Sequence, residues 1–493
     1  MRKLIFIATL IFNHLALANE TVVIEDVTII SPHLAKPMQH MQVVIAQGRI
    51  EEILPSKRQW AKDVQIIDGR GLYLLPGIMD SHVHVSAVPG MGFGVEPVVQ
   101  KHTELAEEYY RQQPLSFLYH GVTQVVDPNP GLQWQKFTAA DAHPDYFRCE
   151  VIATANTFPI VEKTDALAKS MFPFLIDEGV DEQAKTSPEK VAKKIAESGA
   201  KCIKLYFEDG YGDDGHWPLL SDNTLRRIRL AATQNNLLIV AHANALDMYQ
   251  KALAFDVDVI AHGLWNWGEF SRQNDITQSM AVTLDNLIEK GVGYIPTQRV
   301  IAGLGELMLQ NSNQVADFND VTPKSLLDWY QQPEADWFKQ ELRVGFDGLP
   351  DEIIARIFLQ DRVSKGAKII QHLNKADYSV LLGSDFPGSP SYANQPGLTT
   401  FLEMKAMAEA GLSLSQVLAA ATINNARQFN MQKDYGTVEV GKVANLLLLT
   451  QSPLDTIDAW RKIRSVILHG EVFKRERFAA NSMFNTALQQ SNH

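Results

Sequence analysis

The sequence predicts an α/β protein that consists of a (β/α)8 (TIM) barrel and a small composite β-sandwich domain. Residues 74–431 alternate apolar, strand-like segments with helical segments, which is typical of a parallel βα architecture. Eight such units predict a closed barrel, with a doubly wound open sheet as the alternative. Residues 19–73 and 432–480 instead contain short β segments, so we expect these two stretches to combine into one domain.

Eight apolar runs are the predicted barrel strands: residues 74–85, 121–127, 148–155, 200–207, 237–243, 257–263, 291–298 and 378–386. Helical segments separate them, and one begins at Ser187 and Pro188, a pair that favours a helix start. The interval 299–376 is long and polar, and a structureless loop of that length is rare in a compact domain. We therefore predict that residues 299–376 form a helical cap over the site.

The N-terminus has the three parts of a secretory signal peptide. Arg2 and Lys3 are positive, residues 4–12 are apolar, and residues 16–18 (Ala-Leu-Ala) form a small-x-small cleavage site. The apolar run is short for a bilayer span, and no later segment approaches the roughly 20 apolar residues that a span needs. We predict that residues 1–18 are a signal peptide and that the protein is exported, either to the periplasm or to the medium.

The net charge narrows the classes of partner, while the cysteines, the C-terminal residues and the oligomeric state leave several alternatives open. The formal net charge is −12 and basic runs are absent from the sequence, which argues against nucleic acid or an anionic membrane surface as a partner. Cys149 and Cys202 leave two alternatives open, one disulfide or two buried thiols. Residues 481–493 are predicted to be a polar tail. The sequence leaves the oligomeric state open, with a homo-oligomer as one possibility.

Six polar side chains share one position, at or near the C-terminal end of a predicted barrel strand, where such barrels place their active sites. They are His82, His84, Lys204, His242, His262 and Asp385. A single histidine or aspartate at a strand end is usually structural, but four imidazoles and a carboxylate converging on one rim suit divalent ions such as zinc. Lys204 is unusual because an ammonium buried between isoleucine and leucine is costly without a partner.

These motifs resemble the amidohydrolase superfamily over nearly the whole chain. The resemblance rests on LPGIMDSHVHV and HGVTQVVD early in the chain, on the six polar residues in order, and on ATINNARQFNM and YGTVEVGKVANLLLL near the end. Asn445 replaces the usual aspartate of the last motif, a departure that we expect to lie far from the barrel mouth. The sequence is most similar to the imidazolonepropionase-like and Xaa-Pro (prolidase-type) dipeptidase branch.

The resemblance implies a dinuclear centre. Lys204 would be carboxylated by CO2 to a carbamate that bridges two metal ions, expected to be zinc. His82, His84 and Asp385 would complete the shell of the first metal, while His242 and His262 would hold the second. The family's mononuclear deaminases usually carry a glutamate three residues after the fifth-strand histidine. Ala245 stands at that position here, which weighs against deamination.

A mechanism follows from this ligand set. The two metals would make hydroxide available near neutral pH and polarise the scissile carbonyl. Asp385 is predicted to act as the catalytic proton shuttle from the water to the leaving amine. Asp80 is predicted either to hold a metal ligand in place or to have a structural role.

The predicted substrates are dipeptides or N-acyl amino acids. Tyr206, His216 and Arg299 are predicted to bind a substrate carboxylate, with packing or surface roles as the alternative for each. Lactones, phosphotriesters and cyclic amides are alternative substrates. A non-catalytic binding protein on the same scaffold is a further alternative, and it would predict lost metal ligands, whereas every expected ligand is present.

Overall fold

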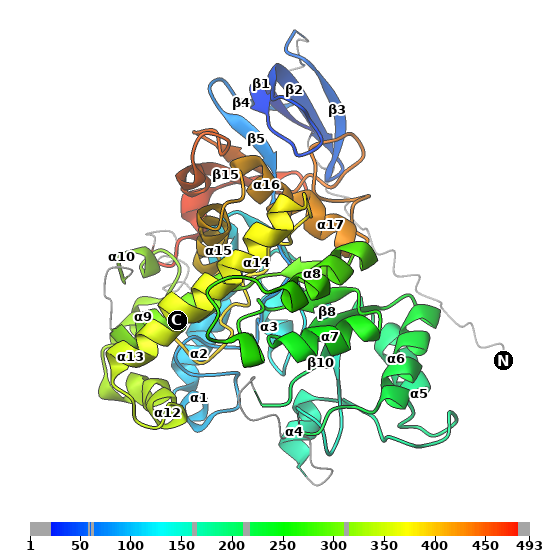
Figure 1. The fold of residues 1–493 in the computed structure, drawn as a ribbon. Helices are drawn as coiled ribbons and strands as arrows, with labels where there is room; N and C mark the ends of the chain where they lie inside the picture. Colours follow the sequence, from blue (N-terminus) through cyan, green and yellow to red (C-terminus); the bar gives the residue numbers. More distant parts are fainter. Residues whose placement is uncertain are drawn as a thin grey trace, which may run out of the picture.

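The computed structural model describes residues 21–57, 60, 64–159, 165–210, 217–309 and 315–481. The predicted signal peptide, His216 and residues 482–493 of the predicted tail lie outside these ranges. Within the described residues, no helix has the length and mean hydropathy that a bilayer crossing requires. Figure 1 shows a small sheet at one end of the molecule and a larger α/β body beneath it.

Seven parallel strands form most of a barrel in the larger body. They pair in the order β6, β7, β8, β10, β11, β12, β13, and a short strand, β9, pairs with β8. Their bounds are β6 Ile78–Asp80, β7 Val122–Asp127, β8 Asp145–Ala153, β9 Phe174–Leu175, β10 Cys202–Tyr206, β11 Leu238–His242, β12 Val259–Ala261 and β13 Gly293–Ile295. Each of the seven falls within or beside a predicted barrel strand, because a strand buried on both faces is apolar throughout.

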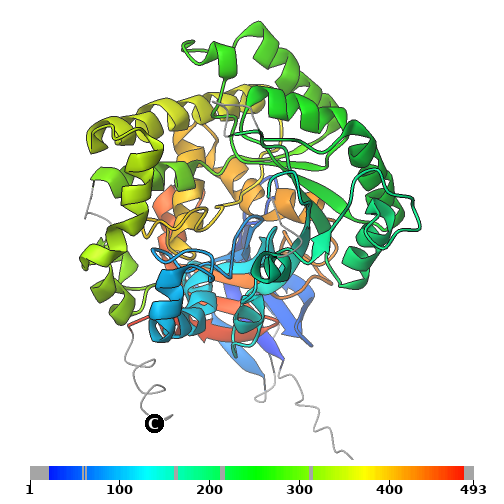
Figure 2. The same cartoon turned by 90° about the horizontal axis from the view of Figure 1, so that it is seen from below.

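The eighth predicted strand, residues 378–386, closes this sheet. Val380 makes a parallel bridge to Tyr294 in β13, and Phe386 makes one to Val83, just after β6. The last strand of the sheet is thereby joined to the first, as a (β/α)8 barrel requires. The open doubly wound alternative is wrong for this reason. Figure 2 shows the resulting ring of helices around the strands.

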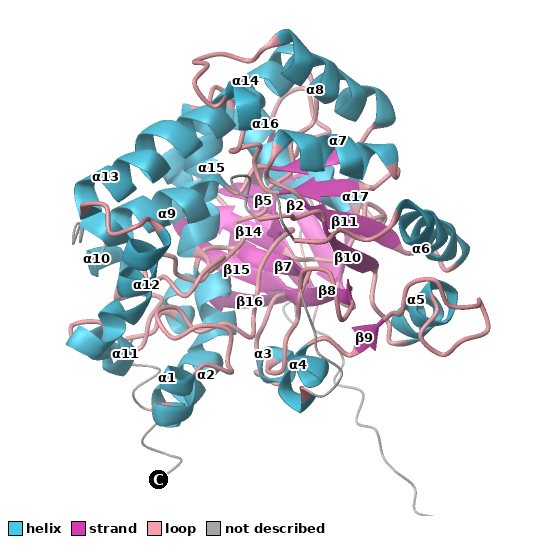
Figure 3. Ribbon diagram, turned by 60° about the horizontal axis from the view of Figure 1, so that its bottom comes forward, coloured by secondary structure: helices cyan, strands magenta, loops and turns pink. Residues whose placement is uncertain are grey.

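Helices cover the outside of the barrel (Figure 3). They are α1 Pro97–Lys101, α2 Thr103–Tyr119, α3 Trp134–Thr138, α4 Ala166–Met171, α5 Pro188–Glu197, α6 Asp222–Gln234, α7 Leu246–Ala254, α8 Gln278–Lys290, α15 Leu398–Glu409, α16 Leu414–Ala419 and α17 Asn425–Gln428, with short turns η1 Gly268–Phe270 and η5 Ala420–Asn424. α5 begins as predicted, because the Ser187 side chain accepts a hydrogen bond from Lys190 N–H (3.3 Å) and Pro188 fills the first turn.

The segment predicted as a helical cap is helical. It contains α9 Gln298–Leu309, α10 Val315–Phe318, α11 Lys324–Trp329, η3 Pro333–Asp336, α12 Trp337–Gly345, α13 Asp351–Arg356, η4 Ile357–Arg362 and α14 Val363–Lys375. Two of its aromatic side chains bind the loop that follows the first barrel strand. Tyr330 OH donates to Pro89 O (3.0 Å), and Trp337 Nε1–H donates to Gly90 O (2.7 Å). These bonds attach the segment beside the barrel mouth; its role as a cap stays a prediction.

Strands from both ends of the chain form the second sheet, in the order β16, β15, β14, β5, β1, β2, β3, with β4 paired to β1. Their bounds are β1 Val22–Ile29, β2 Met38–Ala46, β3 Arg49–Pro55, β4 Gln65–Asp68, β5 Tyr73–Pro76, β14 Leu446–Leu449, β15 Ile463–Leu468 and β16 Glu471–Lys474, with turns η6 Ile457–Arg461 and η7 Arg475–Phe478. The two predicted β segments therefore share one hydrogen-bonded sheet. A sandwich of two stacked sheets stays a prediction.

The four leucines of β14 connect this sheet to the barrel. All four side chains are buried, because successive residues of a strand point to opposite faces and both faces are covered. Leu446 and Leu448 belong to the core of the small sheet. Leu447 and Leu449 belong to the large core that also contains the barrel helices.

Cys149 and Cys202 form a disulfide. They are register partners on the neighbouring strands β8 and β10, and both are fully buried. The sequence left this pairing open, because the two residues meet only through the alignment of two strands.

Asn445 lies at the N-terminal end of the barrel strands, opposite the mouth. Its Nδ2 donates to Asp145 Oδ2 (2.7 Å), at the start of β8, and its carbonyl accepts from Gly77 N–H (2.9 Å) just before β6. This position agrees with the expectation that the departure at Asn445 lies far from the predicted site.

Candidate metal centre

The barrel brings the six predicted side chains to one end of its strands. His82 and His84 follow β6, and Asp385 lies in the closing segment beside them, where its N–H donates to His82 O (2.7 Å). Lys204 lies in β10, His242 ends β11 and His262 follows β12. The C-terminal ends of parallel barrel strands meet at one rim, so residues from distant parts of the sequence become neighbours.

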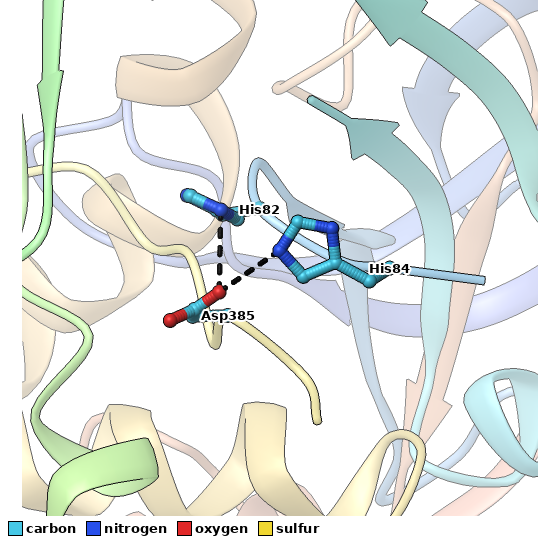
Figure 4. Close-up of side chains that lie close together, drawn as sticks. All are labelled: His82, His84 and Asp385. Atoms are coloured by element: carbon cyan, nitrogen blue, oxygen red, sulfur yellow. Dashed lines mark hydrogen bonds and ion pairs between the residues drawn. The ribbon is translucent and has the colours of Figure 1, made fainter. Parts of the chain in front are cut away.

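Three imidazoles surround the Asp385 carboxylate. Its Oδ1 lies 3.1 Å from His84 Nε2 and 3.3 Å from His82 Nε2, the two contacts drawn in Figure 4. Its Oδ2 lies 3.3 Å from His262 Nδ1. The ligand atoms of His82, His84 and Asp385 all lie within 4.8 Å of one another, a spacing that one metal ion can bridge.

His242 joins the group from the other side. Its ring centroid is 4.5 Å from that of His262, and His262 is in turn 5.0 Å from His82. His242 Nε2 lies 3.1 Å from the carboxylate of Glu208 rather than beside Asp385. The four imidazoles thus form one cluster. Three of them contact the Asp385 carboxylate, and the fourth contacts the Glu208 carboxylate.

Lys204 is buried within this cluster. The residue is 1% exposed, and its Nζ has no hydrogen-bond partner among the described residues. Burial lowers the pKa of Lys204 to about 7, although the charge of Asp385 acts in the opposite direction. The Lys204 charge also lowers the pKa of His82 and of His262, which places the amine within electrostatic reach of the histidines.

The environment keeps the imidazoles in the form that binds metals. Burial lowers the pKa of His82 well below its usual range and that of His262 to about 3. Burial alone would raise the pKa of Asp385, but the adjacent His262 and His82 hold it well below its ordinary value. Neutral imidazoles beside an ionised carboxylate are the protonation states that divalent ions require.

The backbone at the site adopts conformations that few residues tolerate. Asp385, His262 and Thr297 have positive φ angles of 55°, 85° and 46°. Thr297 Oγ1 lies 3.3 Å from His262 Nδ1. Such conformations persist where the surrounding structure enforces them, and they cluster at functional sites.

Asp80 fixes the backbone on both sides of the site. Its Oδ1 accepts from His82 N–H (3.2 Å) and from Ser384 N–H (2.9 Å), and its Oδ2 accepts from the Thr400 hydroxyl (2.6 Å) on α15. Burial raises the pKa of Asp80 to about 6. Asp80 therefore acts on the chain that carries His82 and Asp385, rather than on a ligand side chain.

Sequence reasoning missed two buried carboxylates beside the histidines. Asp127 ends β7, 3.8 Å from His84 Nδ1, and its position at a strand end was the available signal. Glu208 follows β10 and contacts His242, which belongs to β11, so spacing along the sequence gave no sign of the pair. Ala245, three residues after His242, is buried at the N-cap position of α7, without a capping hydrogen bond from its side chain.

Glu403 was also missed. It is fully buried on α15, and its two oxygens accept from the first backbone N–H groups of α9, those of Gln298 (3.0 Å) and Arg299 (2.6 Å). The carboxylate thus caps α9 directly after Thr297. Burial raises the pKa of Glu403 to about 8.

The predicted substrate-binding residues have different surroundings. Tyr206 is half-buried at the rim, with its ring 5.0 Å from that of His242. Arg299 is 4% exposed, and Glu306 binds its guanidinium through two contacts of 2.6 Å. A substrate carboxylate would compete with Glu306 there, so carboxylate binding by Arg299 stays a prediction. His216 lies outside the described residues.

Two further aromatic rings extend from Tyr206. Phe158 lies 5.2 Å from the Tyr206 ring, and Trp217 stacks on Phe158 at 4.9 Å with an interplanar angle of 10°. All three side chains are half-buried. We refer to Phe158, Tyr206 and Trp217 as the aromatic shelf; its Tyr206 ring borders His242.

The donor set fits divalent metals. Both ring nitrogens of His82 and the amine of Lys204 are buried without hydrogen bonds among the described residues, although buried polar atoms in proteins are nearly always satisfied. Four imidazoles and one shared carboxylate are the ligands that zinc prefers. The chemistry of these residues therefore matches a metal centre better than a structural cluster.

The match to a known family extends over most of the chain. The model of the amidohydrolase family matches residues 73–473, so the protein belongs to the amidohydrolase family. That range covers the barrel, the candidate centre, β14, β15 and all but the last residue of β16. Membership agrees with the resemblance that the sequence motifs indicate.

The similarities to individual proteins either cover a short stretch of the sequence or concern the fold alone. The imidazolonepropionase of Symbiobacterium thermophilum is 43% identical over 74 residues, which span 15% of this chain and 16% of that relative. The crystal structure of a Xaa-Pro dipeptidase with bound methionine has a TM-score of 0.61 at 18% identity, covering 92% of this chain and all of that one. The A. niger ochratoxinase structure has a TM-score of 0.64 at 16% identity, covering 95% and 99%. At these identities the two structures establish a shared fold.

Proposed function

We propose that this protein is an exported, dinuclear metal-dependent hydrolase that cleaves an amide or peptide bond of dipeptides or N-acyl amino acids. The observation that carries the proposal is the buried amine of Lys204, unpaired among the described residues within a cluster of histidines. A buried ammonium without a partner is costly. The ammonium would first lose a proton, and the neutral amine would then form an N–C bond with CO2 at Nζ and release a second proton. The loss of two protons converts the cation into an anionic ligand.

The ligand atoms would divide between two ions, expected to be zinc. His82, His84 and Asp385 would hold the first, while His242 and His262 would hold the second, with carboxylated Lys204 between them. Metals bound there would lower the pKa of water and polarise the scissile carbonyl.

Asp385 is the residue that we propose to move the proton. It accepts the proton of the attacking water and passes it to the leaving nitrogen. Asp385 is held for this role by its N–H bond to His82 O and by Asp80, which binds the neighbouring Ser384 N–H.

The aromatic shelf supports substrates with an apolar group beside the scissile bond, because its Tyr206 ring borders His242 and the Phe158 and Trp217 rings extend from Tyr206. The similarity in fold to a Xaa-Pro dipeptidase is consistent with a dipeptide. The imidazolonepropionase relative favours a second candidate, a substrate that contains an imidazolone ring.

Two observations support export. The N-terminal sequence has the pattern of a signal peptide. The Cys149–Cys202 disulfide suits an oxidising compartment outside the cytoplasm. N-terminal sequencing of protein recovered from the periplasm or medium should begin at Asn19; a chain that retains residues 1–18 would contradict export by this route.

The experiment that tests the proposal combines metal analysis with a substrate screen. The zinc-loaded protein should contain about two ions per chain and should hydrolyse members of a dipeptide and N-acyl amino acid library. Lys204→Ala should lose turnover and at least one ion. Lys339→Ala, which removes a buried lysine paired with Asp351, is the matched control and should keep both ions.

Three outcomes would contradict the proposal. A content of well under one bound ion per chain would show that these residues do not form a metal centre. Turnover of lactones or phosphotriesters without any amide would assign a different reaction. Turnover of an imidazolone substrate alone would favour the second candidate.

A further inference from the structure

A buried carboxylate contacts one of the four histidines from outside the predicted ligand set. The side chain of Glu208 is 1% exposed. Its Oε2 lies 3.1 Å from His242 Nε2 and accepts from Asn244 Nδ2–H at 3.1 Å. Its Oε1 accepts from Gly210 N–H at 2.9 Å. Both carboxylate oxygens are therefore engaged by nitrogen groups.

This contact determines which nitrogen of His242 carries hydrogen. A carboxylate oxygen accepts hydrogen bonds and does not donate them, so the partner atom His242 Nε2 must be the donor in its contact with Glu208. Asn244 Nδ2 also lies near His242 Nε2, at 3.5 Å, but its shorter hydrogen bond, of 3.1 Å, is to Glu208 Oε2. A neutral imidazole has one N–H and one lone pair. With hydrogen on Nε2, the lone pair of His242 is on Nδ1.

Among the described residues, none of the other three histidines has a carboxylate from outside the predicted ligand set at hydrogen-bond distance; Asp127 lies 3.8 Å from His84 Nδ1. His82, His84 and His262 contact Asp385, which is itself a predicted ligand. His242 alone contacts, at hydrogen-bond distance, a carboxylate that belongs to no predicted shell. Imidazoles that bind metals through one nitrogen commonly donate the other N–H to a carboxylate, and this outer contact fixes the ring orientation.

We propose that Glu208 is a positioning residue that holds His242 with hydrogen on Nε2 and so makes Nδ1 the nitrogen that binds the second metal. The inference rests on the proposed function, because it requires a metal at His242. Direct ligation by Glu208 is disfavoured because Asn244 and Gly210 already donate to its oxygens.

Glu208→Gln tests the inference with little change in size. The amide side chain of this variant has one neutral accepting oxygen in place of two charged ones, although His242, Asn244 and Gly210 all direct nitrogen groups at this side chain. His242 Nε2 therefore faces either the amide NH2 or a neutral oxygen that it shares with Asn244, and both arrangements weaken the preference for hydrogen on Nε2. We expect binding of the second zinc to weaken about 10- to 100-fold while the first zinc stays bound.

The measurements are zinc per chain under competition with a chelator, and nitrogen NMR of the histidine rings in the metal-free protein. Wild type should bind two zinc ions and show His242 protonated on Nε2. Glu208→Gln should weaken binding of only the second ion and shift that proton towards Nδ1. Glu150→Gln, which replaces another buried glutamate paired with Arg148, should behave as wild type.

Other outcomes overturn the inference and separate it from the proposed function. If the Glu208→Gln protein binds both ions as tightly as wild type, Glu208 does not position His242. A weakened second ion with an unchanged His242 tautomer would make Glu208 a direct ligand instead. If wild type itself binds fewer than two ions, the dinuclear centre fails, and with it the basis of this inference.

Discussion

Gly383 allows the last barrel strand to approach the first at the candidate centre. It lies two residues before Asp385, against the chain that carries His82. A Cβ atom added at Gly383 would lie 2.5 Å from Ile295 Cγ2, 2.9 Å from His82 Cβ and 3.2 Å from His82 N. Because real Cβ atoms essentially never approach within 3.0 Å, Gly383→Ala must move the strand or the histidine.

The size of the effect follows from these distances. Restoring an ordinary contact requires a shift of about 0.5–1 Å, and forcing an extra methyl group into a packed core costs about 1–3 kcal/mol. The same shift would disturb the contacts of 3.1 and 3.3 Å between Asp385 and His84 and His82. Misplacing catalytic groups by about 1 Å can reduce the rate roughly 100-fold.

The assay compares Gly383→Ala with wild type for zinc content, kcat/KM and the free energy of unfolding of the metal-free chain. Gly345→Ala is the control, since no atom lies within 4 Å of its added Cβ. We expect the control to match wild type or to gain up to about 1 kcal/mol. A Gly383→Ala protein with wild-type stability and turnover would refute the argument from close approach.

Three other predictions concern buried contacts away from the ligand atoms. Replacing Cys149 and Cys202 together by alanine should lower the free energy of unfolding by roughly 2–4 kcal/mol, measured by urea denaturation; an unchanged midpoint would contradict this. Asp80→Ala leaves three buried donors without an acceptor and should cost about 3 kcal/mol or more by the same assay, whereas a loss below about 1 kcal/mol would count against it. Burial raises the pKa of Glu403 from 4.5 to about 8, so the folded chain binds a proton that the unfolded chain has released. Stability should therefore fall as pH rises through that window, and Glu403→Gln should flatten the slope; equal slopes would be evidence against the raised pKa.

Much of the fold and the centre could be predicted because barrel strands place their C-terminal ends together. His242 and His262 each end an apolar run, and that local pattern was enough to locate them on the same rim. The closing strand was predictable for the same reason, since Asp385 follows an apolar run that ends in a turn.

Contacts between neighbouring strands could not be predicted from local sequence patterns. Glu208 meets His242 only because β10 and β11 pair in register, with Tyr206 opposite His242. The cysteines meet by the same kind of alignment. Arg299 was predicted at a strand end, but α9 begins at Gln298, so Arg299 lies in a first helical turn and pairs with Glu306 two turns later on the same face.

The composite sheet has a consequence for the order of folding. β5 runs through Gly77 into β6, which leads to His82, yet its neighbour β14 is made almost at the end of the chain: Leu75 pairs with Leu447. Such long-range pairing is slow to form, and a strand awaiting its partner exposes an edge that can bind other chains. The first predicted metal ligands are therefore anchored late in synthesis, so a nascent chain stays incompletely folded until β14 emerges. A chain of this design would remain suited to passage through a translocation channel for most of its synthesis, and it would depend on protection from aggregation during that time.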